Sequence, residues 1–339
     1  MAVKVGIIGC GSISIHRHIP EYFKHPDAQL VAFCDTDEQR AQAAALEYGG
    51  EVYTDWREML DQAELDAVSV CTPNADHAPI SMGALRAKKH VLCEKPMATS
   101  MDDARVMVKA ADKNGVQLMI GHNQRLMSPH RKAKEILQGG SLGRVLTFRT
   151  AFGHGGPESW SAEGKNTWFF RKDQAVIGAL GDLGVHKVDL LRWLLDDDIV
   201  EVGALTGTLE KHADVDDNAV MLLRTRGGAF GTLAASWTHH PGEDNSTVLY
   251  CEKGHIRIVE DPVYQVVVHR GDGSVEKHEL GGIATNEEGG QTDSGVIASF
   301  VDAITSGAPN PIPGEEGMKS LEVVLAAVKA AETKSIVSL

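Results

Sequence analysis

The stretch that decides the fold of the first half is Val3-Lys4-Val5-Gly6-Ile7-Ile8-Gly9-Cys10-Gly11-Ser12-Ile13-Ser14. Its apolar beginning predicts a buried strand that runs directly into a glycine-rich turn. The turn follows the pattern GxGxxG, with serine at the third glycine. There the first glycine permits a tight turn, the second lets a pyrophosphate approach the backbone, and the third position needs only a small residue. The stretch predicts a dinucleotide-binding turn at Gly9, Gly11, Ser12 and Ile13; a plain strand-to-helix turn is the other interpretation.

An acidic residue ends the second predicted strand. Leu30-Val31-Ala32-Phe33-Cys34 is followed by Asp35, about 20 residues beyond the glycine turn, where a carboxylate accepts hydrogen bonds from ribose hydroxyls. A carboxylate at this place also repels a 2′-phosphate, so the sequence predicts NAD, with NADP less favoured. Thr36 and Arg40 lie close by and soften that preference. The alternative is that Asp35 is only a turn residue or a helix cap.

Strand-like and helix-like segments alternate through the first 122 residues. The expected strands are Val3–Ile8, Leu30–Cys34, Ala67–Cys71, His90–Cys93 and Val116–Ile120, and the expected helices are Glu38–Tyr48, Trp56–Leu60, Pro79–Ala87 and Met101–Asn114. This alternation is typical of βαβ units around a parallel sheet covered on both faces. We therefore expect an α/β fold whose residues 1–122 form a Rossmann domain with a doubly wound parallel sheet.

The pattern changes after residue 122. Helices are expected at Arg131–Gln138 and Asp182–Leu195, and strands at Val200–Leu209, Ala219–Arg224, Ala229–Trp237, Ser246–Cys251, His255–Val259 and Tyr264–His269. Alternation of polar and apolar residues predicts a large, open, mainly antiparallel sheet. Residues 123–314 are therefore expected to form an α+β domain that binds the substrate and carries the oligomer contacts. Helices are also expected at Ser294–Ile304 and Glu315–Thr333, and we expect residues 315–339 to pack back on the first domain.

Composition excludes several classes of protein. The 339 residues include 33 basic and 47 acidic side chains, a net charge of −14 that disfavours nucleic acid and anionic membranes as partners. No apolar window is long enough for a membrane helix, and no signal peptide is evident, so we expect a cytoplasmic protein. Five cysteines without a CxxC pair argue against a disulfide framework and a structural zinc site.

Two further strands end in polar residues at the edge where doubly wound folds hold their ligands. Thr72-Pro73-Asn74, with His77 after it, follows one strand, and Glu94-Lys95-Pro96 follows the next. Lys95 is the sharper candidate, because a lysine beside a positively charged nicotinamide can hydrogen-bond a substrate hydroxyl oxygen. A solvated loop lysine is the alternative.

A third candidate lies in the second domain, in Gly181-Asp182-Leu183-Gly184-Val185-His186. On a helix, Asp182 and His186 stand at i and i+4 on one face. Histidine exchanges a proton near neutral pH, and a carboxylate orients imidazoles or binds sugar hydroxyls. The alternatives are Asp182 as a helix N-cap and His186 as a core histidine. A metal site is not expected, because no third ligand follows at helical spacing.

Together these residues resemble the glucose-fructose oxidoreductase / inositol 2-dehydrogenase (Gfo/Idh/MocA) family. The matching elements are the glycine turn, Thr72-Pro73-Asn74 with His77, Glu94-Lys95-Pro96, Asn123-Gln124-Arg125 and Gly181-Asp182-x-Gly-x-His186, in family order over nearly the whole chain. Two departures are Ser14 at the third glycine and Gln124 where the family often has arginine. The second leaves the charge of the preferred substrate open.

The resemblance implies a nicotinamide-dependent dehydrogenase with Lys95, Asp182 and His186 as its catalytic residues. His186 would take the proton of a secondary alcohol, Lys95 would stabilise the alkoxide, and Asp182 would hold the substrate and orient His186. The implied cofactor contacts are Gly9, Gly11, Ser12, Ile13, Asp35, Thr72, Pro73, Asn74, His77, Glu94, Lys95 and Asn123. The expected substrate contacts are Lys95, Arg125, His154, Trp168, Asp182 and His186.

The expected activity is NAD(H)-dependent hydride transfer to or from a secondary alcohol of a sugar, sugar derivative or inositol. One alternative is an enzyme that keeps its cofactor bound and both oxidises and reduces in one cycle. Another is a non-catalytic NAD-binding sensor. The resemblance also implies a homodimer or homotetramer, built on the open face of the second-domain sheet.

Overall fold

The computed structural model describes residues 2–281 and 293–339. The chain divides into two compact units. The N-terminal unit contains residues 1–123, 160–168 and 284–318, and the C-terminal unit contains residues 124–159, 169–283 and 319–339. The expected boundary after residue 122 thus lies next to the first division, whereas the two later returns of the chain were not expected. Residues 282–292 of the expected second domain lie outside the described part.

The N-terminal unit is built on a six-stranded parallel sheet in the order β3-β2-β1-β4-β5-β6. Its strands are β1 Val3–Ile8, β2 Ala28–Cys34, β3 Glu51–Tyr53, β4 Ala67–Val70, β5 His90–Cys93 and β6 Leu118–Ile120. All residues of β4 and β6 are buried, as expected of a parallel sheet covered on both faces. The expected Rossmann fold is confirmed.

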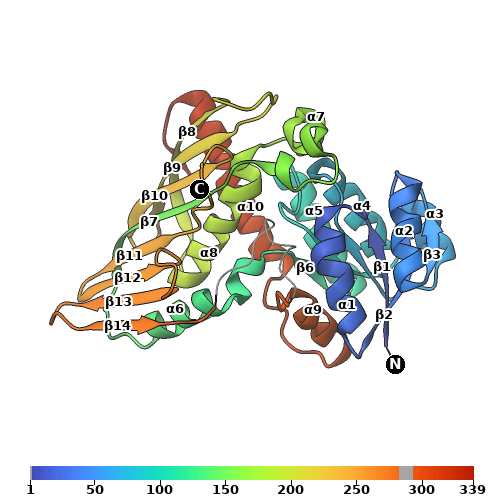
Figure 1. The fold of residues 1–339 in the computed structure, drawn as a ribbon, viewed down its shortest axis with the longest axis horizontal. Coiled ribbons are helices and arrows are strands. Elements are labelled where there is room, and N and C mark those ends of the chain that lie inside the picture. Colours follow the sequence, from blue (N-terminus) through green and yellow to red (C-terminus); the bar gives the residue numbers. More distant parts are fainter. Residues whose placement is uncertain (1, 282–292) are drawn as a thin grey trace. The chain divides into compact units, whose positions relative to one another are not determined.

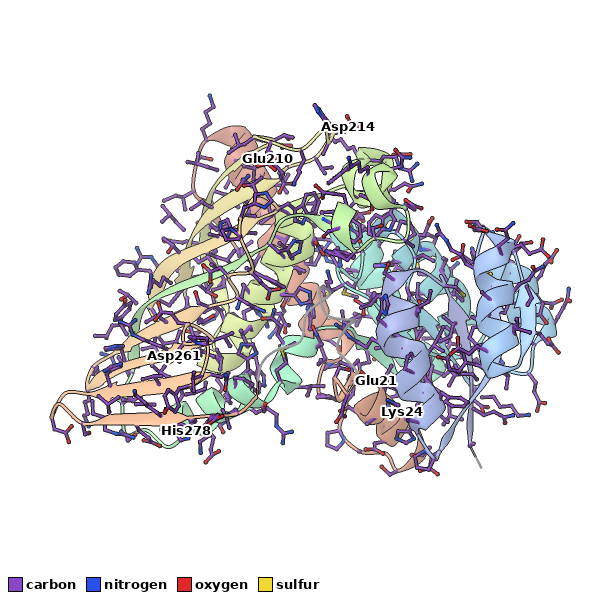
Figure 2. All side chains as sticks on the ribbon, viewed as in Figure 1. Glu21, Lys24, Glu210, Asp214, Asp261 and His278 are labelled. Atoms are coloured by element: carbon purple, nitrogen blue, oxygen red, sulfur yellow. The ribbon has the colours of Figure 1, made fainter. Side chains whose placement is uncertain are left out.

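Helices follow the strands of this unit in doubly wound order (Figure 1). After a π-helical turn at Ser14–His18 come α1 Ile19–Lys24, α2 Glu38–Tyr48, α3 Trp56–Gln62, α4 Asn74–Arg86, α5 Met101–Asn114 and α9 Val296–Thr305. Glu21 of α1, labelled in Figure 2, fixes the chain before α9, because its carboxylate accepts the main-chain N–H of Ser294 at 2.8 Å.

The C-terminal unit contains a nine-stranded sheet in the order β14-β13-β12-β11-β7-β10-β9-β8-β15. Its strands are β7 Val145–Gly153, β8 Ile199–Gly207, β9 Asn218–Thr225, β10 Phe230–Ser236, β11 Thr247–Cys251, β12 Gly254–Ile258, β13 Val266–Arg270, β14 Val275–His278 and β15 Val337–Ser338. All neighbouring pairs are antiparallel except β7 and β10. The expected open, mainly antiparallel sheet is confirmed.

Helices α6 Ser128–Gln138 and α8 Val185–Leu195 cover one face of this sheet (Figure 1). A single turn of helix, α7 Lys172–Ala175, precedes a π-helical turn at Leu180–Gly184 that leads into α8. Short 3-10 turns lie at Pro157–Ser159, Gly164–Asn166 and Trp168–Phe170, and another lies at Asn123–Leu126.

The last long helix, α10 Gly314–Thr333, contains the last boundary between the two units, between Met318 and Lys319. In its first turn, an added Cβ on Gly317 would lie 2.6 Å from Ile120 of β6, so this turn packs against the N-terminal sheet. Residues 319–339 group with the C-terminal unit, where β15 pairs with β8. The expectation that residues 315–339 pack on the first domain therefore describes only the start of the helix.

Candidate active site

The glycine turn after β1 has the geometry that the sequence pattern requires. Gly9 has φ +90°, and an added Cβ would lie 2.6 Å from the carbonyl oxygen of Cys71, so only glycine fits. An added Cβ on Gly11 would meet nothing within 4 Å, so open space lies over this residue. Ser14 is buried and hydrogen-bonds the carbonyl oxygen of Gly9 through its hydroxyl. The turn therefore leaves room for a pyrophosphate at Gly11.

Asp35 anchors the end of β2 to this turn. Its Oδ2 accepts the main-chain N–H of Cys10 at 2.7 Å, and its Oδ1 accepts that of Asp37 at 2.9 Å. Asp37 in turn caps α2 by accepting the main-chain N–H of Gln39 at 3.1 Å. Asp35 therefore acts as a turn residue, as one interpretation held. The same hydrogen bonds place its carboxylate beside the glycine turn.

Residues 160–168, a segment from the middle of the chain, belong to the N-terminal unit and lie beside the glycine turn. The Ser12 hydroxyl donates to the carbonyl oxygen of Trp160 at 2.9 Å. Arg40 lies between two carboxylates, 3.5 Å from Asp37 and 3.9 Å from Glu163. Trp168, an expected substrate contact, donates its main-chain N–H to Glu163 at 2.8 Å within the same segment.

His77 joins the two polar segments that follow β4 and β5. Its Nδ1 lies 2.7 Å from the carbonyl oxygen of Pro96, and its Nε2 lies 2.8 Å from that of Thr72. Burial lowers the pKa of His77, and the neutral ring has a single N–H, so it donates to one of these two carbonyl oxygens. The Thr72 hydroxyl is buried without a hydrogen-bond partner in residues 2–281 and 293–339. An orphaned hydroxyl here fits a polar ligand at this edge of the sheet.

The main chain of Lys95 is held by a buried network that was not expected from the sequence. Its main-chain N–H donates to Glu94 Oε2 at 3.2 Å, while Glu94 Oε1 lies 3.0 Å from His18 Nε2. The other nitrogen of His18 lies 3.2 Å from the Ser69 hydroxyl. An added Cβ on Gly121 would lie 2.9 Å from Glu94, so glycine is needed opposite this carboxylate. Both Glu94 oxygens are therefore engaged within the fold.

The charges in this network stabilise each other. Burial alone would raise the pKa of Glu94, but His18, together with Arg17 and Lys95, lowers it to about 2. Burial alone would lower the pKa of His18, but Cys71 and Glu94 raise it to about 10. At neutral pH the pair is therefore an imidazolium and a carboxylate.

Asp182 and His186 lie on one continuous helical segment of the C-terminal unit. Asp182 lies in the π-helical turn Leu180–Gly184, and His186 is the second residue of α8. Both side chains are buried, with exposed fractions of 5% and 7%. The indole N–H of Trp237 donates to Asp182 Oδ2 at 3.1 Å. Asp182 is therefore not the N-cap of this helix, and its carboxylate is fixed from the side.

Asp216 holds the π-helical turn in place. Its carboxylate accepts the main-chain N–H of Gly178 at 2.9 Å and that of Leu180 at 2.8 Å. An added Cβ on Gly178 would lie only 1.8 Å from the carbonyl oxygen of Asp216. The placement of Asp182 thus depends on a glycine and an aspartate outside the recognised sequence motif.

Phe152 connects His186 to another expected substrate contact, His154. The Phe152 ring centroid lies 5.8 Å from that of His186 and 6.1 Å from that of His154. The main-chain N–H of Gly156 donates to His154 Nδ1 at 3.0 Å, which leaves the ring proton of neutral His154 on Nε2. The Nζ atom of Lys187 lies 5.9 Å from the centroid of the Phe152 ring. Burial lowers the pKa of this lysine to about 7.

Arg125, also an expected substrate contact, forms a buried ion pair. Its Nε and Nη2 donate to the two oxygens of Asp189, each at 2.7 Å. The Ser320 hydroxyl donates to the same carboxylate at 3.1 Å. The bidentate pair joins the chain after β6 to α8, which carries His186.

The structure places Gly9, Asp35, Thr72 and Glu94 after the ends of β1, β2, β4 and β5, where the sequence predicted them. Asn74 begins α4, and Asn123 begins the 3-10 turn after β6. Lys95 belongs to the N-terminal unit, and Asp182 and His186 belong to the C-terminal unit. The residues that orient them, His18, Asp216 and Trp237, were not predicted in these roles, because each acts across a long separation in sequence.

Two classes of feature are not found in the described part of the chain. No group of three or more histidine, cysteine, aspartate or glutamate side chains there could hold a metal ion. None of the helices described is both long and apolar enough to cross a membrane.

The parallel sheet, glycine turn and acidic residue after β2 define a dinucleotide-binding unit, joined here to a large mixed sheet. Residues 3–122 match the model of the oxidoreductase family with an NAD-binding Rossmann fold, and residues 130–257 match the GFO/IDH/MocA C-terminal domain. The chain therefore belongs to the Gfo/Idh/MocA family of NAD-binding oxidoreductases, as its motifs predicted.

Similar proteins include sugar and inositol dehydrogenases. The myo-inositol 2-dehydrogenase of Thermotoga maritima is 28% identical and covers 99% of this chain and 98% of its own. The levoglucosan dehydrogenase of Pseudarthrobacter phenanthrenivorans is 28% identical, over 72% of this chain and 69% of its own. A structure of levoglucosan dehydrogenase with NADH and levoglucosan has a TM-score of 0.86 at 25% identity, and covers 100% of this chain and 99% of its own.

Proposed function

We propose that this protein is an NAD(H)-dependent dehydrogenase that acts on a secondary alcohol of a sugar, sugar derivative or inositol. The observation that carries the proposal is the buried pair Asp182 and His186, four residues apart on one helical segment, with the carboxylate already fixed by a hydrogen bond. A buried acid–base pair of this kind is suited to moving a proton at a hydroxyl group. The sugar and inositol relatives support this substrate class.

Each of the proposed catalytic residues has a defined task. His186 holds the proton taken from the reacting hydroxyl, and Asp182 orients the imidazole and binds a sugar hydroxyl. Lys95, whose main chain is fixed through Glu94, presents its ammonium group to the oxygen that becomes negatively charged. His154, with its ring proton on Nε2, is a donor suited to a substrate hydroxyl, and Trp168 and Arg125 remain predicted contacts.

The N-terminal unit fits a nicotinamide dinucleotide. The open space over Gly11, the required glycine at position 9 and the orphaned Thr72 hydroxyl lie along the edge where such a cofactor binds. When bound, NAD supplies the hydride acceptor. Gly9, Gly11, Ser12, Ile13, Asp35, Thr72, Pro73, Asn74, His77, Glu94, Lys95 and Asn123 remain the residues proposed to hold it.

The electrostatics around Arg40 favour NAD over NADP. Arg40 is the cation near Asp35 that would receive a 2′-phosphate, yet it lies between the carboxylates of Asp37 and Glu163. Its charge is therefore largely compensated, and Asp35 adds a repelling carboxylate. The surroundings thus strengthen the preference that the sequence predicted.

The proposal is tested by the absorbance of NADH at 340 nm. The purified protein is incubated with NAD or NADP and a panel of inositols, free aldoses, anhydrosugars and glycosides at about pH 9, where release of a proton favours oxidation. We expect turnover with NAD and little with NADP. Bound nicotinamide in the purified protein, with turnover only when a second sugar is added, would identify the enzyme that retains its cofactor. NAD binding without turnover of any compound in the panel would favour the alternative of a non-catalytic NAD-binding sensor.

We also propose a homodimer or homotetramer built on the open sheet face. Leu205, Val220, Leu222 and Phe230 lie on the neighbouring strands β8, β9 and β10 and are at least half exposed. An apolar patch across three strands is typical of a surface that another protein covers. A second copy is the occupant that the family resemblance implies.

We further propose that the protein acts in the cytoplasm. All five cysteines are buried free thiols, and burial raises the pKa of Cys10, Cys34, Cys93 and Cys251. Free thiols without disulfides fit a reducing compartment.

A further inference from the structure

We propose that Trp237 is a positioning residue for Asp182, in that its indole N–H fixes the direction in which the Asp182 carboxylate is presented. This inference rests on the proposed catalytic role of Asp182. It assigns to Trp237 a task that differs from the sugar stacking that an aromatic residue in a carbohydrate enzyme would suggest. The ring is fully buried within the C-terminal unit, with an exposed fraction of 0%, so it offers no face to a substrate.

The indole is fixed by its own surroundings. The main-chain N–H of Trp237 donates to the carbonyl oxygen of Asp217 at 2.8 Å. The edges of Phe169 and Phe170 meet the indole at centroid distances of 6.2 and 5.8 Å, with interplanar angles of 87° and 62°. These contacts hold the ring in one orientation, so its N–H is aimed at Asp182 before any substrate arrives.

The chemistry of the bond explains why tryptophan is suited to this place. The indole N–H is a donor only, so it bonds a carboxylate but cannot accept a proton from it. Asp182 is buried, and the indole N–H supplies a hydrogen bond to its carboxylate inside the fold. The bond also engages Oδ2, which orients the carboxylate plane on the helical segment that carries His186.

The test uses Trp237→Phe, which keeps an aromatic ring and removes only the N–H and part of the ring volume. A hydrogen bond to a charged group contributes enough for its loss to lower kcat about 10- to 100-fold. Because the indole acts on the orientation of the carboxylate and not on cofactor binding, we expect the loss in kcat and little change in the KM for NAD. The matched control is Trp193→Phe, the same change on α8, for which kcat and KM are expected to be unchanged.

A second measurement tests the bond without activity. In the full-length protein labelled with ¹⁵N-tryptophan, the five indole N–H groups give five resonances. Comparison of Trp→Phe variants assigns them, and the four variants at the other positions assign Trp237 by elimination if Trp237→Phe does not fold. We expect Asp182→Asn to shift the Trp237 resonance and to leave that of Trp193 in place.

Two outcomes would overturn the proposal. One is a folded Trp237→Phe protein with the kcat of the wild type. The other is a Trp237 resonance that does not respond to Asp182→Asn. A wild-type protein without turnover would instead refute the proposed function, while the resonance experiment would still decide whether Trp237 holds Asp182.

Discussion

The imidazole Nε2 of His18 lies 3.0 Å from Oε1 of Glu94, and both side chains are buried in the N-terminal unit. Because the other oxygen of Glu94 accepts the main-chain N–H of Lys95, this ion pair fixes the backbone at the residue proposed to stabilise the alkoxide. Glu94 in the Glu94-Lys95-Pro96 motif therefore has a task inside the fold. The charges of the pair also make that task dependent on pH.

The first prediction concerns the stability of this pair. Glu94→Gln should lower the free energy of unfolding by roughly 3–5 kcal/mol, because it leaves the His18 imidazolium buried without its carboxylate. The pKa of Glu94 is lowered to about 2, so its contribution is lost as pH falls from 4.5 toward 2. The pKa of His18 is raised to about 10, so its contribution is lost as pH rises from 6.5 toward 10. In urea denaturation, the free energies of unfolding of the wild type and of Glu94→Gln should differ most in the range from pH 4.5 to 6.5.

The control for this experiment is Glu64→Gln. Glu64 pairs with Lys4, but its side chain is 87% exposed, so the change should cost only ~0–1 kcal/mol. A difference between Glu94→Gln and wild type that stays constant from pH 3 to 9 would contradict the proposed ion pair.

The second prediction concerns Lys95 itself. Lys95→Ala should lower kcat/KM roughly 10²- to 10⁴-fold, because the alkoxide loses its cation, while NADH binding changes less than about tenfold. Turnover at 340 nm and titration of NADH fluorescence measure the two effects separately. Lys113→Ala, at the exposed end of α5, is the control and should behave as wild type. Unchanged turnover in Lys95→Ala would refute the proposed function.

Much of the fold was predictable because the decisive patterns are local. The buried strands of the N-terminal unit are short apolar runs, and the glycine turn follows the first of them without a break. Strand β7 was not among the expected strands, although Phe148, Thr150 and Phe152 are buried at alternate positions. Short strands such as β14 and β15 depend on pairing partners that no local pattern reveals.

The motif residues of the site were predictable from the sequence, but the residues that hold them in place were not. Asp182 and His186 stand out by their spacing, yet the π-helical turn that carries Asp182 depends on Asp216, which comes 34 residues later in the sequence. Arg125 and Asp189 are 64 residues apart and form a bidentate pair that periodicity cannot indicate. Such partners are selected by three-dimensional packing, so only a structure brings them together.

The third prediction concerns the choice of cofactor. Asp35→Asn should weaken NAD binding about tenfold and raise the preference for NADP relative to NAD, because it removes the charge that binds the ribose and repels a 2′-phosphate. An amide has one oxygen for the two main-chain N–H groups of Cys10 and Asp37 that Asp35 now accepts, so one of these hydrogen bonds is kept. Asp55→Asn, the same change at the N-cap of α3, is the control. Equal Kd ratios for the two cofactors in wild type and variant would show that Asp35 does not select NAD.

The fourth prediction concerns the open sheet face. Leu222→Glu places a charge in the middle of the exposed apolar patch and should convert an oligomer to a 36.5 kDa monomer in light scattering. Leu209→Glu is the control, because Leu209 is also exposed, at 78% against 60% for Leu222, but follows the end of β8. A wild-type monomer, or an oligomer that both variants retain, would contradict assembly through this face.

The fifth prediction concerns the turn that presents Asp182. Gly178→Ala should destabilise the protein by about 1–3 kcal/mol, because its Cβ would lie 1.8 Å from the carbonyl oxygen of Asp216, and main-chain atoms must move to relieve the overlap. Since Asp216 holds the π-helical turn through Gly178 and Leu180, that movement displaces the carboxylate of Asp182, proposed to act in catalysis, and kcat should fall even at temperatures where the variant is folded. Gly203→Ala, whose Cβ would have ordinary contacts at 3.7 Å, should change neither quantity. If Gly178→Ala kept both wild-type stability and kcat, Asp182 would not depend on this turn.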